Sequence, residues 1–226
     1  MKRSEINMIL KEMEALLKEH GFSVPPFCNF TPEEWETKGH EYDEIRDNML
    51  GWDITDYGLG NFDKVGFALI TLRNGNQNDP KYKKVYAEKL LMLREGQHSP
   101  MHFHWKKSED IINRGGGTLI IHLYNDDHGA LGDTDVEVNS DGRTYSVPAG
   151  TGIELTPGES ITLWPHQYHD FDVKEGTGKV LIGEVSMCND DTTDNRFLDG
   201  VGRFPTIEED EKPYRLLCNE YPLAKS

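Results

Sequence analysis

Cysteine is scarce in this 226-residue sequence, and long apolar runs are absent. The three cysteines, Cys28, Cys188 and Cys218, are an odd number at wide spacings, which fits neither a disulfide framework nor a CxxC zinc pair. No run approaches the roughly 18 apolar residues of a membrane span. The first 20 residues mix acidic with apolar side chains and lack a cleavage-like site, unlike a secretory signal. These absences predict a cytoplasmic protein without a membrane partner.

Basic residues are also few. Lys and Arg total 24 against 40 Asp and Glu, which gives a net charge of −16, and no basic run is longer than the KYKK at 81–84. Such a surface repels phosphate backbones, so nucleic acid is excluded as a partner. A hydrophobic content of 36% with four Trp and nine each of Tyr and Phe is sufficient for a core. We therefore expect one domain over residues 1–226.

Helical patterns occupy the N-terminal part, residues 1–60. Apolar residues from Ile6 to Leu17 recur at helical spacing and Gly21 follows, which predicts an amphipathic helix over 3–20. Thr31, Pro32 and Glu34 form a start signal for a second, short helix. We expect both helices to pack on a sheet.

From about residue 64 the apolar pattern changes to a period of two. Eight or so short runs, from GFALITLRNG to KVLIGEVSM, are separated by Gly, Pro, Asn and Asp, and Ser140-Asp141-Gly142 predicts a hairpin turn. This pattern predicts an all-β fold, an antiparallel barrel or jelly roll with its core at 64–190.

One segment, GQHSPMHFHWKKSEDIINRGG at 96–116, has the composition of a metal site. In a strand His102 and His104 project to the same face, and Glu109 follows after a break at 105–108. A further ligand must come from a distant strand. His169 shares the parity of the apolar residues Phe171 and Val173, whereas its rival His166 follows a proline at a turn.

The segment resembles motif 1 of the cupin family, G(X)5HXH(X)3–4E(X)6G. The positions that fit every interval are Gly96, His102, His104, Glu109 and Gly116. Motif 2, G(X)5PXG(X)2H(X)3N, matches in length from Gly158 to His169, but its proline falls one place late at Pro165 and its closing position is Val173. The resemblance implies a cupin β-barrel.

A longer resemblance is to the D-lyxose isomerases, cupin-fold sugar isomerases that use Mn²⁺. It is carried by HFHWKKSEDIINRGGGTLIIHLYN, GEVSMCNDDTTDNRFLDG, the N-terminal part ending in PPF and the EDEKPYRLLCNEYP tail. It implies that His102, His104, Glu109 and His169 bind the metal. It also implies interconversion of D-lyxose with D-xylulose, and often of D-mannose with D-fructose.

Three imidazoles and one carboxylate suit this chemistry, because they leave two adjacent positions of an octahedral ion open. An aldose can chelate there through its C1 and C2 oxygens, and a Lewis acid then acidifies the C2 proton and holds the developing cis-enediol. Mn²⁺ suits these nitrogen and oxygen donors, with Fe²⁺, Co²⁺ or Zn²⁺ as alternatives.

Isomerisation further needs groups that move a proton between C2 and C1. Glu184 interrupts the apolar run LIGEVSM, so it either faces a cavity as the base or points outward on a half-exposed strand. Lys107 precedes Glu109 by two residues and is either a catalytic ammonium or a solvated turn residue. Lys89 has the inward parity of Leu91, which predicts a sugar-binding role.

The polar loop NDDTTDNRF could cover the barrel mouth and bind the sugar. Its candidate residues are Asp190, Asp191, Asp194 and Arg196, and a plain charged turn is the alternative. Trp164 and Phe171 either stack on the sugar or belong to the core.

Other functions share this ligand set. A cupin dioxygenase would hold Fe²⁺ in the same place, and a sugar-binding cupin would need no proton-transfer groups. A phosphosugar isomerase would need a basic cluster or phosphate cradle, which the sequence lacks, so a small neutral monosaccharide is favoured. Edge strands that need protection predict a symmetric homodimer.

Overall fold

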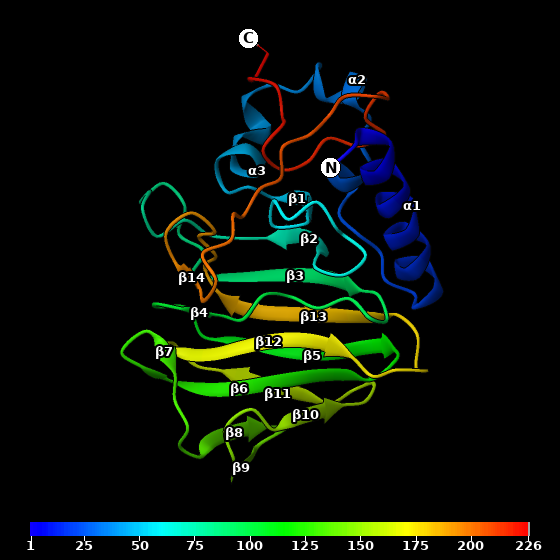
Figure 1. The fold of residues 1–226 in the computed structure, drawn as a ribbon. Coiled ribbons are helices and arrows are strands. Elements are labelled where there is room, and N and C mark those ends of the chain that lie inside the picture. Colours follow the sequence, from blue (N-terminus) through cyan, green and yellow to red (C-terminus); the bar gives the residue numbers. More distant parts are fainter. Residues whose placement is uncertain (226) are drawn as a thin grey trace.

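Two antiparallel β-sheets form the body of the protein, and helices lie at one end (Figure 1). The computed structural model describes residues 1–225. The helical elements are α1 (Arg3–Glu19), η1 (Pro26–Asn29), α2 (Pro32–Trp35), η2 (His40–Tyr42) and α3 (Asp43–Asp47). The strands are β1 (Gly51–Thr55), β2 (Phe67–Arg73), β3 (Tyr86–Leu93), β4 (His102–His104), β5 (Glu109–Gly116), β6 (Leu119–Asp127), β7 (Ala130–Leu131), β8 (Val136–Ser140), β9 (Arg143–Val147), β10 (Gly152–Leu155), β11 (Ser160–Leu163), β12 (Gln167–Val173), β13 (Val180–Met187) and β14 (Asn195–Phe197).

The larger sheet has the order β1-β2-β3-β13-β5-β11-β8-β9, and the smaller has the order β10-β6-β12-β4-β14, with β7 paired to β6. All pairs between these strands are antiparallel, which confirms the predicted all-β barrel. No helix within residues 1–225 has the length and apolar character needed to cross a bilayer.

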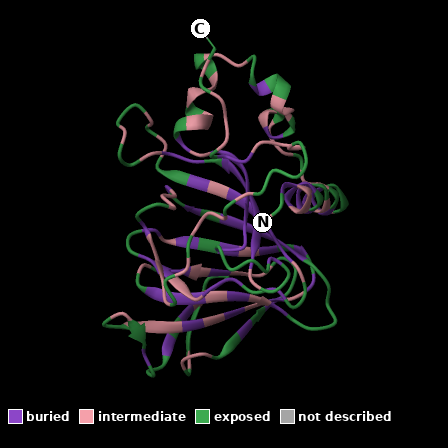
Figure 2. Cartoon of the chain, turned by 45° about the horizontal axis from the view of Figure 1, so that its top comes forward, coloured by how far each residue is buried: buried purple, intermediate pink, exposed green. Residues whose placement is uncertain are grey.

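The larger sheet is buried on both faces where α1 covers it. On β2, Phe67 and Leu69 point into the barrel, whereas Ala68 and Ile70 pack in a second core with the apolar stripe of α1. A strand buried on both faces reads as a continuous apolar run rather than as an alternation. Figure 2 shows that the buried residues lie mainly on the strands. The strands of this sheet that carry site residues are therefore held by packing on both faces.

Both predicted helices form, and α1 packs on the larger sheet as expected. The buried Trp35 of α2 instead stacks on Tyr221 of the C-terminal segment. The helix α1 ends at Glu19, before Gly21, and buries the predicted apolar stripe. At α2 the Thr31 side chain accepts from the Glu34 N–H, and the Glu34 carboxylate accepts from the Thr31 N–H, so the capping box is complete. The predicted turn also forms: Asp141 and Gly142 have φ values of 49° and 76° between β8 and β9. Positive φ at both positions is the geometry of a tight hairpin turn.

Four strands, β1, β5, β7 and β14, lie outside the predicted runs. All five residues of β1 are buried, so a period of two is invisible in the segment expected to be helical. The inward positions of β5 include Asn113 and Gly115, which interrupt its apolar pattern. Asn113 is fully buried and donates to the carbonyls of Gly117 and Leu155, so a polar side chain is stable there.

Candidate metal centre and proton-transfer site

Three histidines converge inside the barrel. His102 and His104 lie on β4 with one residue between them, and β12 pairs His169 directly with His102. Their potential ligand atoms all lie within 4.8 Å of one another. His166 lies outside this group: its ring is half exposed and packs against Phe103. The side-chain parity that favoured His169 over His166 therefore describes the observed geometry.

Hydrogen bonds orient two of these rings. The Nδ1 atoms of His102 and His169 lie 2.8 and 2.9 Å from the carbonyl oxygens of Pro100 and Gln167. These contacts assign Nδ1 as the protonated nitrogen and leave Nε2 with a free lone pair. The Nε2 atom of His169 is buried and lacks a protein hydrogen-bond partner within residues 1–225. Burial lowers the pKa of His102 and, helped by Lys107, that of His104, so both rings are neutral at pH 7.

Glu109, the first residue of β5, faces the histidines. Its Oε1 lies 3.3 Å from Nε2 of His104 and 3.4 Å from Nε2 of His169. Its Oε2 lies 2.6 Å from Nζ of Lys107. Burial disfavours the charged carboxylate, but Lys107 and His104 outweigh it and hold the pKa of Glu109 well below its usual range. Glu109 therefore presents an anionic oxygen to the three-histidine cluster.

Next to this cluster lies a buried ion-pair group. Oε1 of Glu184 is 3.0 Å from Nζ of Lys107 and 3.2 Å from Nζ of Lys89, and it accepts from the Ser186 hydroxyl at 3.1 Å. Both ammonium groups also donate to Oδ1 of Asn189. Burial lowers the pKa of Lys107, but Glu109 and Glu184 outweigh it and the net shift is upward. No protein group within residues 1–225 donates to the other Glu184 oxygen, Oε2.

A cavity of about 50 Å³ connects the histidines with the ion pairs. Its lining combines charged with apolar side chains: Tyr57, Phe67, Leu69, Lys89, Leu91, His102, His104, Lys107, Glu109, Phe171, Glu184, Asp191, Asn195, Phe197 and Arg203. The structure thus brings the inward candidates Lys89, Lys107 and Glu184 into one cavity with two of the histidines, His102 and His104. Of the loop candidates, it brings only Asp191 there.

Two polar lining residues, Arg203 and Asn195, and one residue behind them, Asp53, were missed by sequence reasoning. Arg203 pairs with Asp53 at 2.5 Å and with Asp191 at 3.3 Å, and Asn195 donates to Asp191 at 3.3 Å. Burial raises the pKa of Asp53, whereas at Asp191 the nearby cations outweigh burial and lower the pKa. Asp53 within the buried run GWDIT was the available signal, since a buried carboxylate requires a partner. Nothing near Arg203 in the sequence marks it.

The remaining candidates lie outside the cavity lining. The Asp194 carboxylate accepts from the N–H groups of Lys106 and Lys107, so it holds the turn that carries Lys107. The Arg196 guanidinium donates to the Tyr168 hydroxyl and the Gly129 carbonyl. Trp164 is about half exposed and lines grooves on the outer surface.

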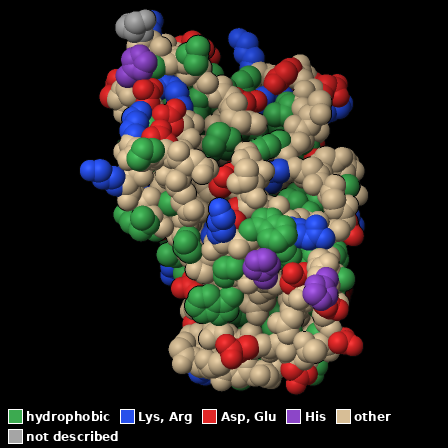
Figure 3. Space-filling model, turned by 90° about the vertical axis from the view of Figure 1, so that its left-hand side faces the viewer, with side chains coloured by type: hydrophobic (Ala, Val, Ile, Leu, Met, Phe, Trp, Pro, Cys, Tyr) green, Lys and Arg blue, Asp and Glu red, His purple; other side chains and the backbone are tan. Residues whose placement is uncertain are grey.

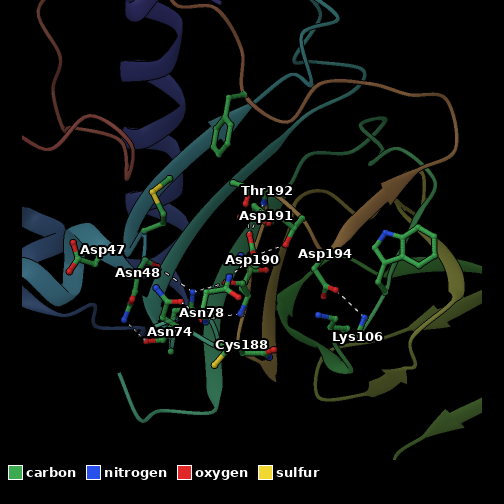
Figure 4. Close-up of a pocket in the computed structure, with 18 residues that line it drawn as sticks. Asp47, Asn48, Asn74, Asn78, Lys106, Cys188, Asp190, Asp191, Thr192 and Asp194 are labelled. Carbon is green, nitrogen blue, oxygen red and sulfur yellow. Dashed lines mark hydrogen bonds between the residues drawn. The ribbon is translucent and has the colours of Figure 1, made fainter. Parts of the chain in front are cut away.

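A larger outer pocket of about 460 Å³ adjoins the segment 188–194 (Figure 4). Its labelled residues include Asp47, Asn74 and Asp190, and the dashed line from Asp194 to Lys106 marks the turn contact. Asp190 caps its own loop by accepting from Thr192 and Thr193. Asp191 lines both this pocket and the inner cavity. The space-filling view in Figure 3 shows hydrophobic, basic and histidine side chains close together on one side of the molecule.

Residues 1–221 match the D-lyxose isomerase family. A protein of Serratia proteamaculans, named D-lyxose/D-mannose isomerase, is 48% identical over 223 residues, which cover 98% of both chains. A protein of the same name from Escherichia coli O157:H7 is 47% identical with the same coverage.

Solved structures support the fold. The L-ribose isomerase of Acinetobacter sp. DL28 superposes with a TM-score of 0.60 at 13% identity, covering 91% of this chain and 98% of that one. That of Cellulomonas parahominis gives 0.56 at 14% identity with the same coverage. The predicted cupin fold is therefore confirmed. With nearly its whole length matched, the chain belongs to the D-lyxose isomerase family and is a sugar isomerase.

Proposed function

We propose that this enzyme interconverts D-lyxose with D-xylulose, and D-mannose with D-fructose, in a metal-dependent reaction. The observation that carries the proposal is the cavity in which His102, His104 and Glu109 adjoin the Lys107–Glu184–Lys89 ion pairs. His169 lies next to these two histidines. The two relatives named D-lyxose/D-mannose isomerase support the choice of sugars.

The side chains around the cluster fit a divalent cation. His169 Nε2 is an unpartnered buried acceptor, and Glu109 Oε1 lies close to two imidazole nitrogens. His102, His104, His169 and Glu109 would hold the ion, and their nitrogen and oxygen donors suit Mn²⁺, Fe²⁺, Co²⁺ or Zn²⁺. When bound, the metal supplies Lewis-acid polarisation of the sugar carbonyl. Mn²⁺ is our choice because the family resemblance implies it.

Glu184 is assigned as the base that moves the proton between C2 and C1. Lys107 and Ser186 donate hydrogen bonds to Oε1, and the Lys89 ammonium forms an ion pair with the same oxygen, which fixes the carboxylate and leaves Oε2 free to accept a proton. Lys107 and Lys89 both contact this carboxylate through Oε1. The Lys107 ammonium can also donate a hydrogen bond to a sugar oxygen. The reaction passes through an enediol: Glu184 takes a proton from C2 and returns a proton to C1, while the C2 hydroxyl loses its proton and O1 gains one. The proton on Glu184 can exchange with solvent between the two steps.

The charge of the cavity favours a neutral sugar. Its cations, Lys89, Lys107 and Arg203, are each paired with an acidic side chain. A phosphosugar would need cations that are free to bind its phosphate group.

A panel of pentoses and hexoses with Mn²⁺, assayed anaerobically for ketose formation, tests the function. We expect turnover of D-lyxose and D-mannose without oxygen. Oxygen-dependent consumption would identify a dioxygenase instead. Binding of sugar without ketose formation, and without deuterium uptake from D₂O, would identify a sugar-binding protein.

We also propose a homodimer formed through the outer face of the larger sheet. Exposed apolar side chains line one groove there: Trp164, Val185 and Met187. An exposed apolar group on a sheet typically marks an interface. We expect a dimer by light scattering and a monomer after Met187→Lys; a monomeric wild-type enzyme would refute this assembly.

Finally, we propose the cytoplasm as the compartment of the enzyme. Cys28, Cys188 and Cys218 are all free and buried, and burial raises the pKa of each thiol. Unpaired thiols suit a reducing compartment. Exclusive recovery of activity from the periplasm of a fractionated host cell would contradict this assignment.

A further inference from the structure

Two polar atoms at the cavity lack partners although they are buried. They are Nη1 of Arg203, a donor, and Oδ1 of Asn195, an acceptor. Within residues 1–225 no protein group forms a hydrogen bond with either atom. A buried polar atom without a partner costs about 1–3 kcal/mol, so such atoms are retained where a ligand pairs with them.

Asp191 fixes both side chains by their other ends. Its Oδ1 accepts from Nδ2 of Asn195, and its Oδ2 accepts from Nη2 of Arg203, each at 3.3 Å. The same Nη2 donates to Asp53 at 2.5 Å. Asn195 is therefore held through Nδ2 and Arg203 through Nη2, which leaves Asn195 Oδ1 and Arg203 Nη1 without protein partners within residues 1–225.

The pair lies beside the histidine cluster. On β14, Asn195 is paired with His104 of β4, and Phe197 is paired with His102. Both Asn195 and Arg203 line the cavity that contains Glu184. Because directly paired residues of antiparallel strands point to the same face, Asn195 and His104 face the same side of this sheet.

We propose that Arg203 and Asn195 form a subsite for one hydroxyl of the sugar, away from C1 and C2. A hydroxyl accepts one hydrogen bond and donates another, which is the complement of one free N–H and one free oxygen. The two acidic partners of Arg203, Asp53 and Asp191, offset its positive charge, so the subsite selects a neutral hydroxyl and rejects a phosphate. This inference rests on the proposed sugar-isomerase function.

The test measures kcat and KM for D-lyxose and its 3-, 4- and 5-deoxy analogues. The variants are Arg203→Lys, which keeps a charge for Asp53 but loses the second donor group, and Asn195→Leu. We expect each to raise KM for D-lyxose about tenfold or more, with kcat and bound Mn²⁺ nearly unchanged. For one deoxy analogue, wild type and variants should have the same KM. Arg73→Lys, at an exposed ion pair on β2, is the matched control.

Several outcomes would overturn the subsite. The first is a KM for D-lyxose that is unchanged in both variants. The second is an increase in KM that is equally large for D-lyxose and for all three deoxy analogues. If circular dichroism shows that a variant is misfolded, the wild-type enzyme still tests the subsite. At least one of the three deoxy analogues must then have a higher KM than D-lyxose. D-mannose 6-phosphate should not inhibit at ten times the KM of D-mannose, and strong inhibition would refute the selection against phosphate. A wild-type enzyme that isomerises no neutral sugar would instead refute the proposed function.

Discussion

Replacing Glu184 with glutamine removes the proposed base while preserving its position. Gln retains the Oε1 acceptor that Lys107, Lys89 and Ser186 contact, and it replaces only the free Oε2 with an amide. A general base typically contributes a factor of about 10²–10⁴. We therefore expect kcat to fall at least about 100-fold, which corresponds to about 2.7 kcal/mol of barrier.

The same contacts predict a folded variant with nearly normal binding. Lys107 keeps its ion pair with Glu109 and Lys89 keeps its hydrogen bond to Asn189, so neither ammonium is left without a partner. KM and bound Mn²⁺ should change little. Glu154→Gln, at an exposed ion pair with Lys174 on the β10 surface, is the control and should leave kcat unchanged.

The assay follows ketose formation in D₂O by NMR. Wild type should incorporate deuterium at C1 of the ketose, because a proton carried by Glu184 can exchange with solvent. Near wild-type kcat in Glu184→Gln would refute the role of this carboxylate. If wild-type product carries no deuterium and a C2-deuterated aldose also fails to exchange its label at raised temperature, the enediol is refuted.

Three further predictions follow from the site and the fold. Exhaustive chelation should abolish turnover and Mn²⁺ should restore it; full activity in protein that contains no metal by elemental analysis would reject the metal site. His169→Ala should lose bound metal and activity while His166→Ala retains both, because only His169 lies in the cluster; the reverse result would invalidate the parity argument. Glu12 is partly buried, which opposes its ionisation, but bonds from Arg94 and Lys179 outweigh burial and lower its pKa. Its contribution to stability is present above its unfolded pKa of about 4.3 and is lost as the pH falls through the lower folded value. Glu12→Gln should therefore reduce the free energy of unfolding by about 1–2 kcal/mol at pH 7 and have almost no effect near pH 2; an equal loss at both pH values by urea denaturation would contradict this account.

Local signals in the sequence were sufficient for much of the fold. The capping box at Thr31 and the turn at Asp141 and Gly142 depend on residues adjacent in the chain, so their geometry is encoded locally. The spacing of His102 and His104 likewise determines that they share a face, because side chains alternate along a strand. The parity of Lys89 predicted its inward direction for the same reason, whereas the apolar neighbours of Glu184 left an inward and an outward direction open until the structure placed it in the cavity.

Pairing between distant segments was decided only by the tertiary structure. The register of β12 against β4 places His169 opposite His102, and the fold brings Asp53 and Asp191 to the same guanidinium of Arg203. Neither β1, buried on both faces, nor the coil around Arg203 carries a periodic signal. Sequence pattern therefore determined which way strand residues point, whereas the contacts that leave atoms of Arg203 and Asn195 without partners exist only after segments far apart in the chain have packed together.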